Sequence, residues 1–454
     1  MIIDANHLQE KDRVSTDICI VGGGVAGLTL AKELLNSGRE VCVLEQGGMS
    51  DEDEIQKALR GRVVGYPYWG LDFARHAQVG GTSHRWFLGL ADGGMGGRFR
   101  PLDPIDFEER EEIPHSGWPL TRRQLDPYYE RAQRLLRLGP YEYAVEEWAS
   151  RDETVLGEAD PLQTVIFQFG GREPFAEEYP DELAASETTT ILYHSHVRSL
   201  STYESGRAVS TADVVTPNGS EFRVEANVFV LALGGIENAR LLLLSKDHCP
   251  DGLGNEHDLV GRYFMEHPHF MSGLFWPSDP SLFDQDDLYF TNLRRNTTIQ
   301  GKLALREDVL RREQLRNFCI SLWPTADPYD KVYRSPAYDA VRMFKSTLRN
   351  GYLPDRPLRR GWTILRHGRR LVRHLASRVA RKVRQAVDAP NSAVAYRLHH
   401  FSEQAPNPRS RVRLADDKLD PFGQPCAELD LQFTDDDIRD VLRGQEIRSE
   451  ERRV

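Results

Sequence analysis

The sequence predicts a mixed α/β fold, α+β overall, with a first domain of alternating strands and helices and a second domain built on an antiparallel sheet. Two observations support this. Residues 17–45 contain an apolar run, a glycine-rich turn, a helical pattern and a second apolar run. From about residue 270 onward, runs such as 299–305 and 317–322 alternate in the way that half-buried antiparallel strands do.

The opening unit, residues 17–45, has the order strand, turn, helix, strand. Gly22, Gly24 and Gly27 follow the first strand in G-x-G-x-x-G spacing. The first glycine allows the tight turn, the second lets the backbone approach a pyrophosphate, and the third lets the helix pack closely on the strand. The second strand ends on Glu45, which can accept hydrogen bonds from a ribose diol and would repel a 2′-phosphate. These features predict a Rossmann-like site for FAD or NAD rather than NADP.

The rest of the first domain contains fewer clear signals. Residues 50–110 are rich in glycine, arginine and aromatic side chains, and we expect a long loop region there. A helix is predicted over 120–138, with Thr121 as its N-cap. A hairpin is predicted over 209–233 and leads through a second glycine turn into another helix.

Composition excludes several classes of protein. The chain has 454 residues and a net charge of -11, which argues against general nucleic-acid binding. Its five cysteines contain no C-x-x-C pair, and no cluster of histidines and carboxylates has metal-ligand spacing, so we predict neither a disulfide framework nor a metal site. No basic segment followed by an apolar core opens the chain, and no apolar run approaches the ~18 residues of a membrane helix. We therefore expect a cytoplasmic protein.

A basic segment spans residues 355–387, where apolar residues such as Leu358, Trp362 and Leu365 recur at helical spacing. Two interpretations are open. The helix packs on its own protein, or its basic face contacts an anionic membrane surface or a protein partner. The oligomeric state is not predicted.

Four long motifs occur in a fixed order: VGGTSHRW at 79–86, IPHSGWPLTRRQLDPYYERA at 113–132, VFVLALGGIENARLLLLS at 228–245 and LVGRYFMEHPH at 259–269. From about residue 15 to about residue 445, the chain resembles the glucose–methanol–choline (GMC) oxidoreductases, in the branch of pyranose oxidase and bacterial sugar dehydrogenases. The resemblance implies FAD as cofactor and a small alcohol or sugar as substrate. Its CH–OH group would be oxidised by hydride transfer to flavin N5.

The resemblance also implies a domain division and a set of binding residues. The FAD-binding domain would cover 1–265 with an inserted region at 50–190, the substrate domain 266–405, and an incomplete return toward the FAD domain 406–454. The residues implied to contact FAD are Gly22, Gly24, Gly27, Glu45, Gly80, Gly81, Thr82, His84, Val197 and Gly234.

The family's catalytic base is a histidine in a C-terminal segment, and no histidine follows His400 here. Histidine suits this role because its pKa lies near physiological pH. His84, His267 and His269 are the candidates that remain, each with a purely structural role as the alternative. Two other hypotheses stay open. The chain is a truncated or partner-dependent flavoprotein without activity of its own, or it belongs to another FAD class, such as a hydroxylase or reductase.

Overall fold

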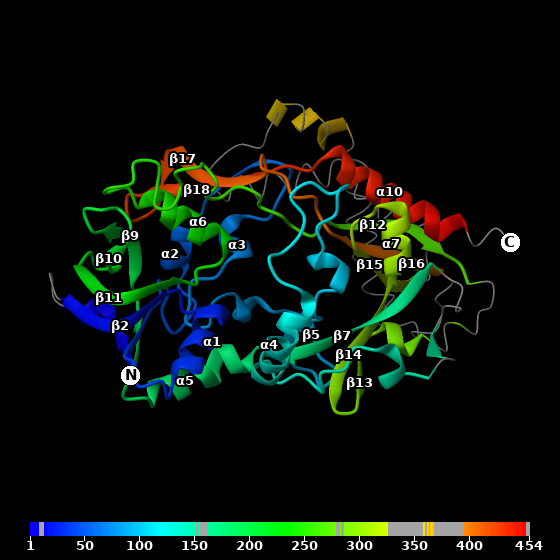
Figure 1. The fold of residues 1–454 in the computed structure, drawn as a ribbon, viewed down its shortest axis with the longest axis horizontal. Helices are drawn as coiled ribbons and strands as arrows, with labels where there is room; N and C mark the ends of the chain where they lie inside the picture. The colour runs from blue at the N-terminus through cyan, green and yellow to red at the C-terminus, as the bar shows by residue number, and fades with distance from the viewer. Residues whose placement is uncertain are drawn as a thin grey trace.

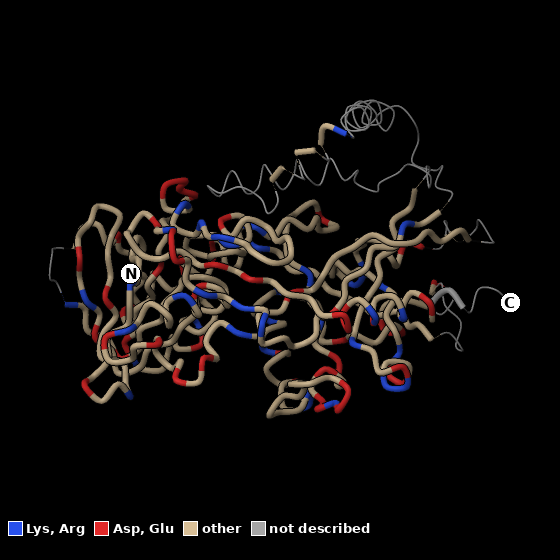
Figure 2. Tube along the Cα trace, turned by 90° about the horizontal axis from the view of Figure 1, so that it is seen from above, with Lys and Arg blue, Asp and Glu red and all other residues tan. Residues whose placement is uncertain are grey.

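The structure is a computed structural model that describes residues 1–8, 13–150, 153–154, 161–277, 282, 286–325, 357–358, 361–362, 364–366 and 395–450. It contains a Rossmann-like sheet at one end and an antiparallel sheet at the other (Figure 1), as the sequence predicts. Acidic and basic residues are interspersed along the described chain (Figure 2). The basic segment 355–387 lies almost entirely outside the described residues.

The first sheet has seven strands, and its central strands are buried on both faces. The strand order is β1 (Ile2–Asp4), β8 (Thr189–Tyr193), β3 (Val41–Leu44), β2 (Arg13–Val21), β11 (Glu221–Leu231), β10 (Val209–Val215) and β9 (His196–Thr202). The first five strands run parallel, and the last two add antiparallel pairs. Every residue of β3 is buried, as a parallel strand covered on both faces requires.

Helices cover the two faces of this sheet. On one face, α1 (Val25–Leu34) and α5 (Tyr179–Ala184) pack against Ile20 and Val43. On the other face, α6 (Gly235–Leu244) contributes Leu241 to a second core. The helix and hairpin predicted farther along are also confirmed. The first is α4 (Arg122–Leu135), capped reciprocally by Thr121 and Gln124, and the second is the β10–β11 pair.

The second sheet has eight strands, all paired antiparallel. The order is β12 (His269–Phe275), β16 (Ala395–Ser402), β15 (Phe318–Thr325), β14 (Thr297–Leu305), β7 (Leu162–Gly171), β6 (Met95–Phe99) and β5 (Leu88–Gly89), with β13 (Asn292–Arg294) paired to β14. The two alternating runs predicted from the sequence lie in β14 and β15. One face of this sheet carries the largest core, which includes Ile166, Leu303 and Ile320.

The expectation of a long loop over 50–110 is wrong. The region contains α2 (Asp53–Gln56), β4 (Arg62–Gly65), α3 (Leu71–Ala74), β5 and β6. These elements have two to five residues, too few to show a hydrophobic period. In addition, β5, β6 and β7 arise from the segment 50–190 and pair into the second sheet. The domain division itself stays a prediction.

The C-terminal part of the described chain contacts both halves of the molecule. Strands β17 (Arg411–Leu419) and β18 (Pro425–Leu431) form a small sheet with β4, which packs on Ile236 and Ala239 of α6. Helix α10 (Asp435–Glu450) follows.

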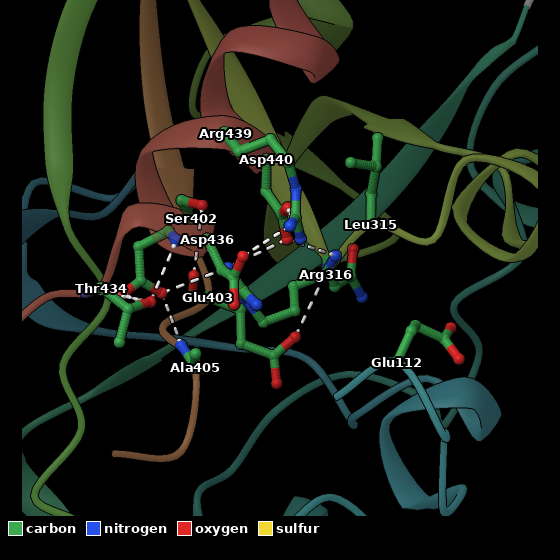
Figure 3. A network of polar contacts seen from close by, with 12 residues as sticks. Glu112, Leu315, Arg316, Ser402, Glu403, Ala405, Thr434, Asp436, Arg439 and Asp440 are labelled. Atoms are coloured by element: carbon green, nitrogen blue, oxygen red, sulfur yellow. Dashed lines mark hydrogen bonds and ion pairs between the residues drawn. The ribbon is translucent and has the colours of Figure 1, made fainter. Parts of the chain in front are cut away.

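A buried arginine forms ion pairs that hold α10 against the second sheet. Figure 3 shows the network around Arg316, whose Nη2 lies 3.2 Å from Oδ1 of Asp437 and 3.0 Å from Oδ2 of Asp440. Because Arg316 is only 4% exposed, these two carboxylates compensate a charge that has lost its water. No helix in the described ranges combines the length and apolar character needed to cross a membrane.

Candidate functional site

A Cβ added at each of the three glycines of the first turn would meet different surroundings. Gly22 adopts φ +112°, and a Cβ there would lie 2.7 Å from the carbonyl carbon of Ala232. A Cβ on Gly27 would lie 1.9 Å from the carbonyl oxygen of Gly22, so the crossing of helix and strand requires glycine. A Cβ on Gly24 would meet only Cα of Gly81, at 3.8 Å. The protein itself therefore leaves room at Gly24, as expected where a ligand approaches.

This turn opens onto a cavity of about 420 Å³. Most of the residues predicted to contact FAD line it, although they come from four separate segments: Gly22, Gly24, Glu45, Gly81, Thr82, Val197 and Gly234. Val25 and Ala26, the first two residues of α1, line it as well. The cavity thus faces a helix N-terminus, where free N–H groups and the helix dipole favour phosphate.

Three predicted residues lie outside the lining of the cavity. Gly27 is beneath the turn, in contact with Gly22. Gly80 adopts φ +98° and donates its N–H to the carbonyl oxygen of Gly23 at 2.8 Å, which ties the two glycine loops together. His84 bonds through Nε2 to the carbonyl oxygen of Val79 at 2.8 Å. Since a carbonyl only accepts, this nitrogen of His84 is the donor, and the contact to flavin stays a prediction.

Glu45 lies at the cavity wall and is 6% exposed. Its Oε2 accepts the N–H of Gly23 at 2.8 Å and its Oε1 accepts the N–H of Gly47 at 2.9 Å. Burial raises the pKa of Glu45 to about 7, and these hydrogen bonds only partly oppose that effect. Each oxygen keeps a lone pair for a further donor, such as a ribose hydroxyl.

The cavity wall also contains an ion-pair network that was not predicted from the sequence. Arg75 and Arg240 both bind the carboxylate of Glu237, and Nη2 of Arg240 lies 2.5 Å from Oδ2 of Asp420. Burial alone would raise the pKa of Glu237, but the two guanidinium groups outweigh it and lower that pKa to about 2. The available signal was the spacing of Glu237 and Arg240, two opposite charges at i, i+3 in α6.

His196 also lines the cavity, although it was not among the residues predicted to do so. Its Nδ1 lies 2.9 Å from Oε1 of Gln46, and its ring stacks on Phe422 at 4.1 Å. Burial and the nearby charge of Arg240 lower the pKa of His196 to about 4. The imidazole is therefore neutral at physiological pH and extends the cavity wall as a flat polar surface.

The structure brings two of the three catalytic candidates together. The rings of His267 and His269 lie 4.6 Å apart at the start of β12. Nδ1 of His267 lies 2.6 Å from Oε1 of Glu266, whose Oε2 accepts the hydroxyl of Tyr68 at 2.7 Å. Tyr68 lines the cavity, so hydrogen bonds through Glu266 link His267 to it, and a ring contact joins His269 to His267. Burial lowers the pKa of His269 to about 4, a change that the nearby His267 reinforces.

In the part of the chain that the structure describes, no three His, Cys, Asp or Glu side chains are placed to hold a metal ion.

Comparison with known proteins gives a family match and distant relatives. A family model described as FAD dependent oxidoreductase matches residues 17–343, more than two thirds of the chain. The 2-methyl-1,2-propanediol dehydrogenase of Mycolicibacterium austroafricanum is 25% identical over 317 residues, which cover 56% of this chain and 55% of the relative. The 6'''-hydroxyparomomycin C oxidase of Streptomyces lividus is 26% identical over 329 residues, or 60% and 58% of the two chains.

This chain spans somewhat more than half the length of these curated relatives. Among solved structures, pyridoxine 4-oxidase from Mesorbium loti superimposes with a TM-score of 0.48 and 16% identity, covering 95% of this chain and 80% of that chain.

Proposed function

The chain belongs to the family of FAD-dependent oxidoreductases, and we propose that it oxidises CH–OH groups of small alcohols or sugars. The cavity beside the glycine turn is the observation that carries the proposal, since it gathers residues from four segments that were predicted separately. Bound FAD supplies the hydride acceptor. The names of two relatives, a diol dehydrogenase and an oxidase, are consistent with this chemistry.

The residues present fit the ADP half of FAD. Gly24 leaves open space on its cavity side, and the start of α1 offers N–H groups to the pyrophosphate. Glu45 has acceptor capacity for the ribose. The order of the four long motifs supports the finer assignment to the GMC oxidoreductases.

His267 suits the role of proton acceptor better than the other two candidates. Its Nδ1 is held by Glu266, which leaves Nε2 as the nitrogen that can take a hydroxyl proton. The low pKa of His269 makes it a weak base at physiological pH. Nε2 of His84 donates to the carbonyl oxygen of Val79, a neutral acceptor, so His84 lacks the carboxylate that would stabilise its protonated form.

The test is flavin reduction by substrate in the absence of oxygen. The purified protein should carry FAD, and its flavin absorbance should bleach when a suitable alcohol or sugar is added. His267→Gln should slow bleaching while leaving FAD content unchanged. A colourless protein that takes up no added FAD would overturn the proposal.

Two further outcomes separate the alternatives. Bleaching by NADH or NADPH, without any response to alcohols, would favour a hydroxylase or reductase. Retained FAD that no alcohol, sugar or nicotinamide reduces would favour a flavoprotein that depends on a partner. Membrane or protein contact through 355–387 and a cytoplasmic location stay predictions.

A further inference from the structure

The two faces of the eight-stranded sheet differ in character. Side chains such as Ile299, Leu303 and Ile320 point into the large core. The alternate residues form the opposite face. In the strand register, Ala304 lies across from Cys319, Cys319 across from Phe401, and Phe401 across from His269. We define the cationic face as Arg98, His269, Lys302, Cys319, His399 and Phe401.

Two cations on this face share the same two aromatic rings. Nζ of Lys302 lies 3.6 Å from the ring centre of Phe401 and 5.3 Å from that of Phe167. Cζ of Arg98 lies 4.7 Å and 5.3 Å from the same two ring centres. The rings offer part of the compensation that a desolvated cation needs, but they carry no charge.

Neither cation has a carboxylate partner among the residues that the structure describes. Lys302 is fully buried, and its Nζ has no hydrogen-bond acceptor there. Nδ1 of His399 is likewise buried without a hydrogen-bond partner in the described ranges. Cys319 does not neutralise the pair, since burial raises the pKa of its thiol and keeps it protonated.

Like charges on the buried Lys302 and the partly buried Arg98 are costly without an anion, because each has lost hydration and repels the other. The pKa values reflect this. Burial lowers the pKa of Lys302 to about 7, and burial together with Lys302 and Arg98 lowers that of His399 to about 4. His269 faces the same group from β12 and is shifted in the same direction. A bound anion would offset the repulsion between these groups and would raise their lowered pKa values.

A chain of side-chain contacts connects the cationic face to the cavity proposed for FAD. The His399 ring lies 5.6 Å from His269, whose ring lies 4.6 Å from His267. From there, Glu266 and Tyr68 continue to the cavity wall. His269 is exposed and Arg98 is partly exposed, so they form the accessible rim above the buried Lys302.

We propose that Arg98 and Lys302 form a subsite for a carboxylate of the substrate, which makes that substrate a hydroxy acid or a sugar acid. This inference rests on the proposed oxidation of CH–OH groups. A planar carboxylate matches the fork of Arg98 and carries one charge. A phosphate dianion would lose more hydration in a setting lined by aromatic rings.

The test compares ligands that differ at one terminal carbon, which is a charged carboxylate in one and a neutral hydroxymethyl group in the other. Binding to the FAD-loaded protein is measured by calorimetry for gluconate and for glucitol, which has a hydroxymethyl group in place of the carboxylate. Gluconate should bind at least about tenfold more tightly, the scale of one charge-assisted hydrogen bond. Glucose 6-phosphate and inorganic phosphate are the further arms.

Three substitutions locate the effect. Lys302→Met and Arg98→Leu should each abolish most of the preference for gluconate, whereas Lys302→Arg should retain it. Lys246→Met, at an exposed lysine just past the end of α6, is the matched control and should change nothing. FAD content and circular dichroism establish that each variant is folded.

A measurement on the native protein needs no variant. Gluconate binding near pH 8 should take up close to one proton, because the anion restores the proton of Lys302. Calorimetry in two buffers with different heats of ionisation measures this proton uptake. Neutral glucitol should take up none.

The results that would overturn the carboxylate subsite differ from those that would overturn the proposed oxidation. Equal affinity for gluconate and glucitol, or a preference that survives both charge-removing substitutions, overturns the subsite even if neutral alcohols bleach the flavin. Tighter binding of glucose 6-phosphate than of gluconate, or of inorganic phosphate alone, also overturns the carboxylate assignment. A carboxylate preference without any bleaching supports the subsite and counts against the oxidation.

Discussion

Glu45 should make the stability of the FAD-free protein fall as pH rises. Its carboxyl group is buried beside Gly23 and Gly47, and burial raises its pKa from an ordinary value of 4.5 to about 7. In the unfolded chain the group loses its proton near 4.5, whereas in the folded chain it keeps it until about 7. The folded state therefore binds more protons across this window, and the free energy of unfolding declines as pH increases through it.

The magnitude follows from the pKa difference. At about 1.4 kcal/mol for each pH unit, the shift of Glu45 from 4.5 to about 7 corresponds to roughly 3 kcal/mol. The contribution is fully favourable below the unfolded pKa and is lost above the folded one. This is a large fraction of the ~5–15 kcal/mol that stabilises a typical domain.

The assay is urea unfolding of the FAD-free protein between about pH 5 and 8, followed by tryptophan fluorescence, for the native chain and for Glu45→Gln. Other groups titrate in the same range, but they are common to both proteins, so the difference between the two curves isolates Glu45. Glutamine keeps the volume and one acceptor oxygen while removing the titration. The native curve should therefore fall toward the variant's as pH rises.

FAD should act in the opposite direction. Ribose hydroxyls that donate to Glu45 favour its charged form, so FAD affinity should increase with pH in the native protein and lose that slope in Glu45→Gln. The variant should also bind FAD more weakly by roughly 1–3 kcal/mol at neutral pH. Parallel stability curves for the two proteins, with equal FAD affinity, would refute both the burial effect and the ribose contact.

Three further substitutions test the cavity. Gly27→Ala should lower the free energy of unfolding by about 1–3 kcal/mol or more in thermal melts of the FAD-free protein, because its Cβ would lie 1.9 Å from a backbone oxygen. Gly24→Ala, with its nearest atom at 3.8 Å, should melt like the native FAD-free protein but retain less flavin on purification. If Gly24→Ala keeps full FAD content, the pyrophosphate does not pass there. Arg240→Met should cost about 3–5 kcal/mol in urea unfolding, since it leaves buried Glu237 short of a cation. If Arg240→Met lowers the free energy of unfolding no more than the exposed substitution Lys246→Met does, the ion-pair network contributes little to stability.

The sequence predicted the glycine turn and the acidic residue after the next strand, because these features depend only on residues close together in the chain. Gly22, Gly24 and Gly27 are constrained within one turn, and Glu45 ends the next strand, so their spacing alone indicates their arrangement. Arg75 and Glu237 are 162 residues apart and meet only when α3 and α6 are assembled. No period or motif in the sequence reports a contact of that kind.

The second sheet also contains a contact between distant segments that the sequence did not predict. The alternation in 299–305 predicted a strand, and β14 confirms it. Alternation assigns Lys302 to the polar face, which is normally the solvated one, yet Lys302 is fully buried. The burial arises because β7, from residues 162–171, pairs beside β14 and places Phe167 near the ammonium group. That pairing crosses more than a hundred residues and was not predicted.

The order of strands in the first sheet determines when the cofactor can be captured during biosynthesis. Strand β2 lies between β3, which follows it after a single helix, and β11, which begins at Glu221. Gly22 packs against Ala232, just past the end of β11. A nascent chain that has been translated only as far as the first glycine turn therefore has one wall of the nucleotide groove and lacks the other. Flavin loading must therefore wait until the chain has been translated past Ala232, and until then the edge of β2 that later pairs with β11 has no partner strand.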